Sequence, residues 1–120
     1  MPDSAIKMSV RRVDAQICII DIEGDITAFA ESELMRAYTA ATEPSARAII
    51  LNFTHLEYMN SSGIGLLVTL MIRMNRLKQR LLAYGLSEHY QHIFELTRLN
   101  EAIGVYPTEI AAVAAAARER

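Results

Sequence analysis

The chain has 120 residues, of which 52% are hydrophobic and 22% are charged, and its formal net charge is −2. This length suits one domain with a core of its own, and the composition argues against intrinsic disorder. The weak negative charge gives no basic field for holding nucleic acid or an anionic membrane surface. We therefore expect a single domain over residues 1–120.

Cysteine usage and the N-terminus bear on the cellular compartment. Cys18 is the single cysteine, so no internal disulfide can form, which fits a reducing compartment. The first four residues lack the basic and apolar regions of a signal peptide, and the longest apolar runs are far too short to span a membrane. The sequence therefore predicts a cytoplasmic protein.

The first part of the chain predicts two strands. Residues 6–13 alternate loosely between apolar and polar side chains. Residues 16–23 are rich in β-branched side chains and predict a largely buried strand. The connection between the two runs is too short for a crossover, so we expect an antiparallel hairpin.

The next segment predicts a helix and the central strand. Thr27 is a candidate N-cap for a helix that ends near Thr42. Residues 46–53 form a nearly continuous apolar run, which is typical of a buried parallel strand. A loop is expected over residues 54–60.

The second half of the chain continues the alternation of helices and strands. The expected elements are a helix over residues 61–77, a strand over 81–84, a helix capped by Ser87 and ending near Leu96, a strand over 103–106, and a helix from Pro107 to Arg118 and Arg120. This spacing is typical of βαβ units. The predicted fold class is α/β, with a mixed, mostly parallel sheet, an N-terminal hairpin and about four helices.

The helix that begins at Ser61 carries more apolar side chains than one buried face requires. Its two apolar stripes are Ile64, Leu67, Val68 and Met71, and beside them Leu66, Leu70, Met74 and Leu77. A helix that lies on one sheet face needs one stripe. A neighbouring helix could cover the second stripe, or the stripe could be partly exposed and bind a partner. Gly65 lacks a side chain and would let such a partner approach closely.

The two serines at the start of this helix also allow two interpretations. A serine oxygen at a helix start can accept a hydrogen bond from a free backbone N–H, which would make Ser61 or Ser62 a plain cap. The second interpretation comes from the surrounding motif. Residues 60–65, Asn-Ser-Ser-Gly-Ile-Gly, resemble the Asp-Ser-Ser/Thr-Gly-apolar-Gly signature of anti-sigma factor antagonists, which belong to the STAS domain family.

The resemblance extends over nearly the whole chain. Residues 24–27 match the family's Gly-acidic-apolar turn, residues 48–53 match its central strand, and residues 93–99 match its late helix and following loop. The resemblance implies a single STAS-like domain. It also implies a regulatory binding protein that has no catalytic activity and requires no cofactor or metal.

The resemblance implies a switch between two partners. In the family, an unmodified antagonist binds an anti-sigma factor that is also a serine kinase, and the sigma factor is released. The kinase then phosphorylates the first serine of the motif, which ends the contact, and a serine phosphatase restores it. That serine is Ser61 here, and the family's aspartate is replaced by Asn60. The expected partner-binding residues are Asn60, Ser61, Ser62, Gly63, Ile64, Gly65, Leu66 and Leu70.

Elementary electrostatics is compatible with a switch at Ser61. A phosphoserine adds about −1.5 to −2 charges at pH 7. The free N–H groups and the dipole of a helix N-terminus favour an anion, so the fold should tolerate the phosphate. Beside an apolar contact surface, the same charge should repel or poorly desolvate a partner.

Other kinds of site match the sequence poorly. A dinucleotide fingerprint needs a small residue where Val68 stands. His89 and His92 are three residues apart on a predicted helix, but no further ligand accompanies them, so a surface or packing role is expected. Asp21 and Glu23 would share a strand face without an evident nucleophile, and are expected to be a solvated strand end.

Two alternatives to the antagonist remain open. A STAS-type scaffold or transport-assembly subunit could use the same surface constitutively, without phosphorylation. A small enzyme with a serine nucleophile would need a base, and no histidine can be placed beside Ser61. The expected partners of the antagonist are an anti-sigma factor serine kinase and a serine phosphatase, with neither nucleic acid nor a membrane involved.

Overall fold

A computed structural model of the chain describes residues 6–118, in which strands and helices alternate as expected. In chain order, the elements are β1 (Ile6–Arg12), β2 (Ile17–Ile26), the 3₁₀ helix η1 (Ala28–Ala30), α1 (Glu31–Thr42), β3 (Ala48–Met59), α2 (Ser61–Arg76), β4 (Arg80–Tyr84), α3 (Glu88–Leu96), the 3₁₀ helix η2 (Leu99–Glu101), β5 (Gly104–Tyr106) and α4 (Glu109–Arg118). The expected continuation of the last helix to Arg120 lies outside the described residues.

The strands form one mixed sheet in the order β1-β2-β3-β4-β5. β1 and β2 form the predicted antiparallel hairpin, with Met8 opposite Ile22. The pairs β2–β3, β3–β4 and β4–β5 are all parallel. Helical crossovers between parallel strands require this alternation, so the predicted α/β fold class is confirmed.

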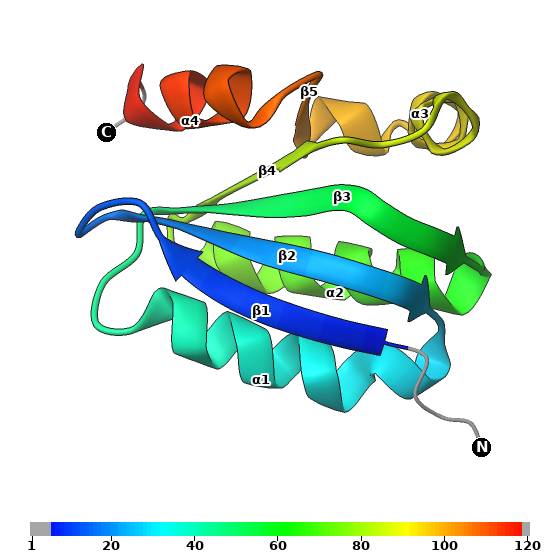
Figure 1. Ribbon diagram of the computed structural model, residues 1–120, viewed down its shortest axis with the longest axis horizontal. Helices are drawn as coiled ribbons and strands as arrows, with labels where there is room; N and C mark the ends of the chain where they lie inside the picture. The colour runs from blue at the N-terminus through cyan, green and yellow to red at the C-terminus, as the bar shows by residue number, and fades with distance from the viewer. Residues whose placement is uncertain (1–5, 119–120) are drawn as a thin grey trace.

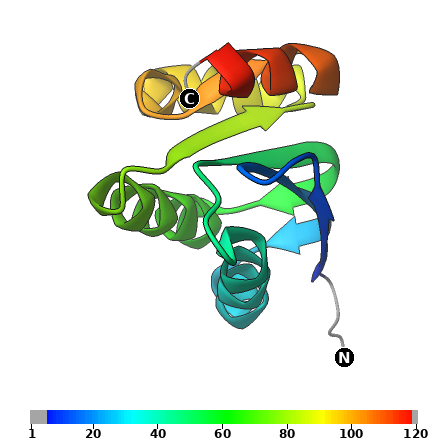
Figure 2. The ribbon, with the colours of Figure 1, turned by 90° about the vertical axis from the view of Figure 1, so that its left-hand side faces the viewer.

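Helices cover both faces of the sheet, but unequally. α1 and α2 run side by side on one face, and α4 lies on the other (Figures 1 and 2). The larger core cluster joins the sheet to α1, α2 and α3, and includes Phe53 and Phe94 in edge-to-face contact at 6.4 Å. The smaller cluster packs the alanines of α4 against the opposite face. Between residues 6 and 118, no helix has both the length and the apolar character needed for a membrane span.

β3 is longer than the sequence predicts. The residues expected to form a loop, 54–60, instead continue the strand as far as Met59 and pair with an equally extended β2. Two register shifts interrupt the pairing, one between Asp21 and Glu23 and one between Gly24 and Asp25. Each shift breaks the alternation of side chains, which explains why this stretch lacks the pattern of a strand.

The turn after β2 also differs in detail from the prediction. Thr27 does cap a helix, since its Oγ1 accepts a hydrogen bond from the backbone N–H of Phe29 at 3.2 Å. The helix that it caps is η1, and α1 begins only at Glu31. The short 3₁₀ turn therefore separates the end of β2 from α1.

At the β1 edge of the sheet, side chains of α1 form hydrogen bonds with the backbone of Met8. The backbone N–H of Met8 in β1 donates to Glu33 Oε2 at 3.0 Å, and its carbonyl accepts from Arg36 Nη2 at 2.8 Å. Glu33 and Arg36 also form an ion pair with each other at 2.8 Å. The hydrogen bonds from Arg36 and Met8 lower the pKa of Glu33, so its carboxylate remains charged at this edge.

Candidate functional site

Residues 59–63 connect β3 to α2, and we call them the Ser61 turn. They lie at the carboxyl end of the parallel strands. β3 ends at Met59, Asn60 makes the connection, and α2 runs back beneath the sheet from Ser61. The ends of β2 and β3 and the first turn of α2 lie at the same end of the molecule (Figure 1). In open α/β sheets this end is the usual place for a binding site.

Asn60 is the residue that caps α2. Its Oδ1 accepts a hydrogen bond from the backbone N–H of Gly63 at 2.9 Å, and its extended backbone is typical of an N-cap. The interpretation of Ser61 or Ser62 as the cap is therefore wrong. Both serines are exposed, and neither hydroxyl forms a hydrogen bond with another residue of the described chain. Because the side-chain amide of Asn60 caps α2, neither serine is needed as a cap.

Gly63 joins the Ser61 turn to the turn after β2. It is buried, and a Cβ atom built on it would lie 2.1 Å from the backbone oxygen of Ile26. The same oxygen accepts a hydrogen bond from the N–H of Asn60 at 3.3 Å. No side chain fits at this contact, so a glycine is required for the two turns to meet.

The inner face of α2 differs from the predicted one. Its buried residues are Gly63, Leu67, Leu70 and Met74. The prediction that Leu66 and Leu70 form an exposed stripe is wrong for Leu70, which is only 1% exposed, and Leu66 is half-buried. Leu77, in the same predicted stripe, is 59% exposed, and of the other stripe only Leu67 is buried, so the buried face of α2 runs between the two predicted stripes.

An apolar surface nevertheless lies beside Ser61, on a different side of the helix. Val68 is half-buried and Ile72 is 47% exposed. At 100° per residue they share a side of α2 with Ser61 and Gly65, and Ile64 borders them. A Cβ atom on Gly65 would meet no atom within 4 Å. We call Ser61, Gly65, Val68 and Ile72 the outer face of α2.

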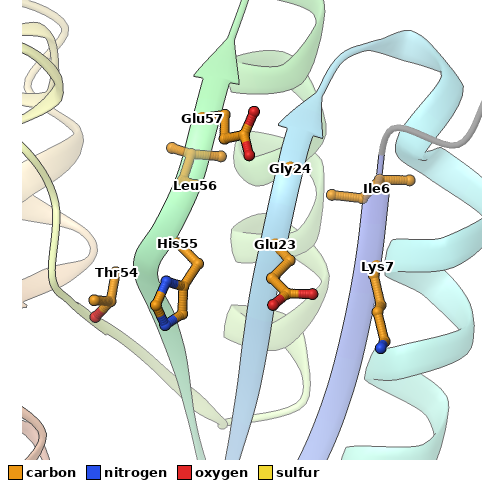
Figure 3. Close-up of a pocket in the computed structure, with 8 residues that line it drawn as sticks. All are labelled: Ile6, Lys7, Glu23, Gly24, Thr54, His55, Leu56 and Glu57. Atoms are coloured by element: carbon orange, nitrogen blue, oxygen red, sulfur yellow. The ribbon is translucent and has the colours of Figure 1, made fainter.

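The chain around Ser61 is acidic. Residues 23–31 and 56–65 contain four carboxylates and neither lysine nor arginine. The carboxylates are Glu23, Asp25, Glu31 and Glu57. None of them forms an ion pair with another residue between 6 and 118. Glu23 and Glu57 line a hollow on the sheet face away from α2, together with Lys7 (Figure 3). Asp25 and Glu31 stand on either side of the turn whose Ile26 carbonyl binds the N–H of Asn60, so a negative charge added at Ser61 would join these two carboxylates.

A shallow hollow of about 670 Å³ lies on the open part of the sheet, away from α2. Lys7, Glu23 and His55 line it from three neighbouring strands (Figure 3). Within residues 6–118, no group of three His, Cys, Asp or Glu side chains could hold a metal ion. The hollow therefore offers mixed charges on an open surface rather than an enclosed site.

A polar cluster beside this hollow was not found from the sequence. Arg11 forms ion pairs with Asp21 at 2.6 Å and with Glu109 of α4 at 3.0 Å, and Tyr84 donates to Glu109 at 2.8 Å. Hydrogen bonds from Arg11 lower the pKa of Asp21 and of Glu109, while burial and Glu109 raise the pKa of Tyr84 to about 12. These residues come from β1, β2, β4 and α4, so no local spacing could reveal them.

The structure gives the contacts of the titratable residues that the sequence analysis singled out. Asp21 also accepts a hydrogen bond from Asn52 at 2.8 Å, so its oxygens already have partners. Cys18 is fully buried, as predicted, and burial raises the pKa of its thiol. His92 lies 3.8 Å from Glu95, and His89 contacts the ring of Tyr90 edge to face. Both histidines thus have the surface contacts that the sequence led us to expect.

Comparison with known proteins places this geometry in a family. Residues 8–112 match the STAS domain, and the chain belongs to the STAS domain family. An anti-sigma-B factor antagonist of Staphylococcus aureus (strain NCTC 8325 / PS 47) is 27% identical over 86 residues, covering 72% of this chain and 80% of that protein.

Two solved structures share the fold. An anti-sigma factor antagonist from Mycobacterium paratuberculosis superposes with a TM-score of 0.80 at 20% identity, covering 98% of this chain and 97% of that one. The phosphorylated form of the Bacillus cell fate determinant SpoIIAA gives a TM-score of 0.70 at 23% identity, covering 95% and 100%. These superpositions confirm the STAS-like fold that the motif led us to expect.

Proposed function

We propose that this chain is an anti-sigma factor antagonist controlled at Ser61. In the unmodified state it binds a kinase-type anti-sigma factor through the Ser61 turn and the outer face of α2. Phosphorylation of Ser61 by that kinase ends the contact, and a serine phosphatase restores it. The S. aureus relative carries the name of such an antagonist, and SpoIIAA is known in a phosphorylated form.

The observation that carries the proposal is the exposed hydroxyl of Ser61. Because Asn60 caps α2 through its own side chain, Ser61 has no structural hydrogen bond to give up when it is modified. It stands at the first position of the helix, about one turn before Gly65 and two turns before Val68 on the outer face. A kinase can reach this hydroxyl, and a phosphate on it would lie within the contact of a partner bound to the outer face.

The charge added by a phosphate would act differently on the fold and on the contact. The first turn of α2 offers backbone N–H groups and the positive end of the helix dipole, which favour an anion. Toward a partner, the phosphate would lie at the start of the outer face of α2. The cost of desolvating the phosphate beside this apolar surface would oppose binding.

Asn60 keeps one function of the aspartate that the family has at this position and loses the other. Its amide oxygen caps the helix as a carboxylate would, so the geometry of the turn is retained. It carries no charge, which makes the surroundings of Ser61 less negative by one. The proposed kinase therefore has to recognise the turn without a carboxylate next to the serine.

The test uses the purified kinase-type anti-sigma factors encoded in the genome that carries this chain. Incubation with ATP should add one phosphate, located at Ser61 by mass spectrometry, and Ser61→Ala should block it. Phosphorylation should weaken binding by about 100-fold, as expected when a charged group must be desolvated in an apolar contact. Ser62→Ala is the matched control for the site of modification, and it should still accept one phosphate at Ser61.

Two outcomes would contradict the proposal. If Ser61→Ala, Ser61→Asp and the unmodified chain all bind one partner equally well, the surface works constitutively, as in a scaffold. If none of the anti-sigma factors binds the unmodified chain at all, the assignment as an antagonist is wrong.

A further inference from the structure

Phe29 is the most exposed large apolar side chain of the described residues. It stands in η1 and is 94% exposed. η1 lies between the end of β2 and the start of α1, at the same end of the molecule as the first turn of α2 (Figure 1). Binding by a partner would remove a large apolar area of this ring from water, which makes Phe29 a candidate anchor of an interface.

The turn that carries Phe29 is held rigidly. Thr27 Oγ1 accepts from the N–H of Phe29 at 3.2 Å, and the carbonyl of Thr27 accepts from the N–H of Ala30 at 2.9 Å. Ile26 and Ala30, on either side of the turn, are almost completely buried. Phe29 therefore has a fixed base, and little conformational entropy would be lost when its ring is bound.

The turn that carries Phe29 contacts the Ser61 turn through the backbone. The carbonyl oxygen of Ile26 accepts from the N–H of Asn60 at 3.3 Å and touches Gly63. Phe29 is three residues beyond Ile26, and Ser61 directly follows Asn60. The turn that carries Phe29 and the turn that carries Ser61 therefore lie side by side, within reach of one protein partner.

The charges around Phe29 specify the chemistry of the partner. Asp25 and Glu31 flank its turn, and neither has an ion-pair partner between residues 6 and 118. With no lysine or arginine in residues 23–31 and 56–65, this surface repels nucleic acid and anionic membranes. It suits a protein whose apolar pocket is bordered by cationic side chains.

We propose that Phe29 is the anchor of the antagonist contact, inserted into an apolar pocket of the anti-sigma factor whose rim carries lysine or arginine opposite Asp25 and Glu31. The proposal rests on the proposed function and adds to it a second contact, separate from the phosphorylated residue. Phosphorylation of Ser61 controls whether the partner is bound, and burial of the Phe29 ring contributes to the affinity of the contact. Buried aromatic anchors of this kind carry a large part of the binding free energy at protein interfaces.

The test compares Phe29→Ala with Ile110→Ala, using the same purified anti-sigma factors. Ile110 is a matched control because it is 83% exposed and stands on α4, on the other face of the sheet. Phe29→Ala should weaken binding by about 30-fold or more, as for an interface hot spot. Ile110→Ala should leave the affinity unchanged. Both variants should keep the wild-type melting temperature, since neither side chain is packed.

A salt titration tests the cationic rim. Binding of the wild type should weaken as the salt concentration rises, and the Asp25→Asn, Glu31→Gln double variant should weaken less steeply. Binding that is independent of salt would overturn the cationic rim.

The remaining outcomes separate the anchor from the function. If Phe29→Ala binds as tightly as the wild type while phosphorylation still releases the partner, the anchor is wrong and the proposed function stands. If the wild type binds none of the factors, both are wrong. If the wild type dimerises in sedimentation experiments and Phe29→Ala does not, a second copy of the chain covers Phe29, and the anchor is again wrong.

Discussion

Leu70 and Ile72 stand two residues apart on α2 and face opposite surroundings. Leu70 is buried with Leu67 and Met74 against the sheet, whereas Ile72 is about half exposed on the side of Ser61 and Gly65. The two faces carry the same kind of side chain. Their difference lies in what covers them, since the inner face is covered by the protein itself and the outer face is exposed to solvent.

The glycines of α2 repeat this contrast. Gly63 is buried against the backbone of Ile26, so the fold requires its missing side chain. Gly65 faces open space, so the fold does not. The comparison teaches that a residue type does not reveal whether it serves stability or recognition, and that the two can be separated by substitutions one helical turn or less apart.

The largest expected effect distinguishes the two apolar faces. Leu70→Lys should lower the free energy of unfolding by about 4 kcal/mol, because packing is lost and an ammonium group is placed in the core. Ile72→Lys should change it by about 0.5 kcal/mol at most and should weaken partner binding. Urea denaturation and binding to the anti-sigma factor measure the two effects. Similar losses of stability in both variants would mean that α2 has no free outer face.

The two glycines should give effects of opposite sign. Gly63→Ala should lower the free energy of unfolding by roughly 1–3 kcal/mol, because its Cβ would overlap the Ile26 carbonyl. Gly65→Ala should raise it by about 0.5–1 kcal/mol, because alanine has the higher helix propensity and the position has room. Thermal melts of the two variants check the prediction, and a destabilising Gly65→Ala would show that the outer face is packed.

Phosphorylation should have the smallest effect on the fold. The helix N-terminus stabilises an anion by about 0.3–1 kcal/mol at an exposed site, which should offset repulsion from the neighbouring acids. The melting temperature of protein phosphorylated at Ser61 should therefore stay within about 4 °C of the unmodified value. Calorimetry on both forms tests this, with Ser61→Ala incubated with kinase as the control. A large drop would mean that the switch works by unfolding the turn.

The sequence predicted most of the architecture because its apolar runs are long and well separated. The hairpin of β1 and β2 and the central strand up to Phe53 follow from such runs. The extension of β3 to Met59 was missed because two register shifts disturb its alternation. That extension matters for the site, since it brings the Ser61 turn alongside the end of β2.

The candidate site was predicted in place but not in detail. The motif located Ser61 at the first turn of α2. The buried face of α2 was assigned incorrectly because both predicted stripes carry leucine and methionine, and the buried residues Leu67, Leu70 and Met74 come from both stripes. Phe29 gave no signal in the sequence, since a single phenylalanine before a helix is as typical of a core as of a surface.

The closed edge of the sheet has a consequence for how this domain can be recognised. With the N–H and carbonyl of Met8 occupied by Glu33 and Arg36, β1 cannot freely accept a strand from another chain at that point. Recognition by strand addition, which depends on backbone groups and is tolerant of sequence, is thereby discouraged. At this point of the edge, a partner would have to contact side chains rather than pair with the backbone of β1.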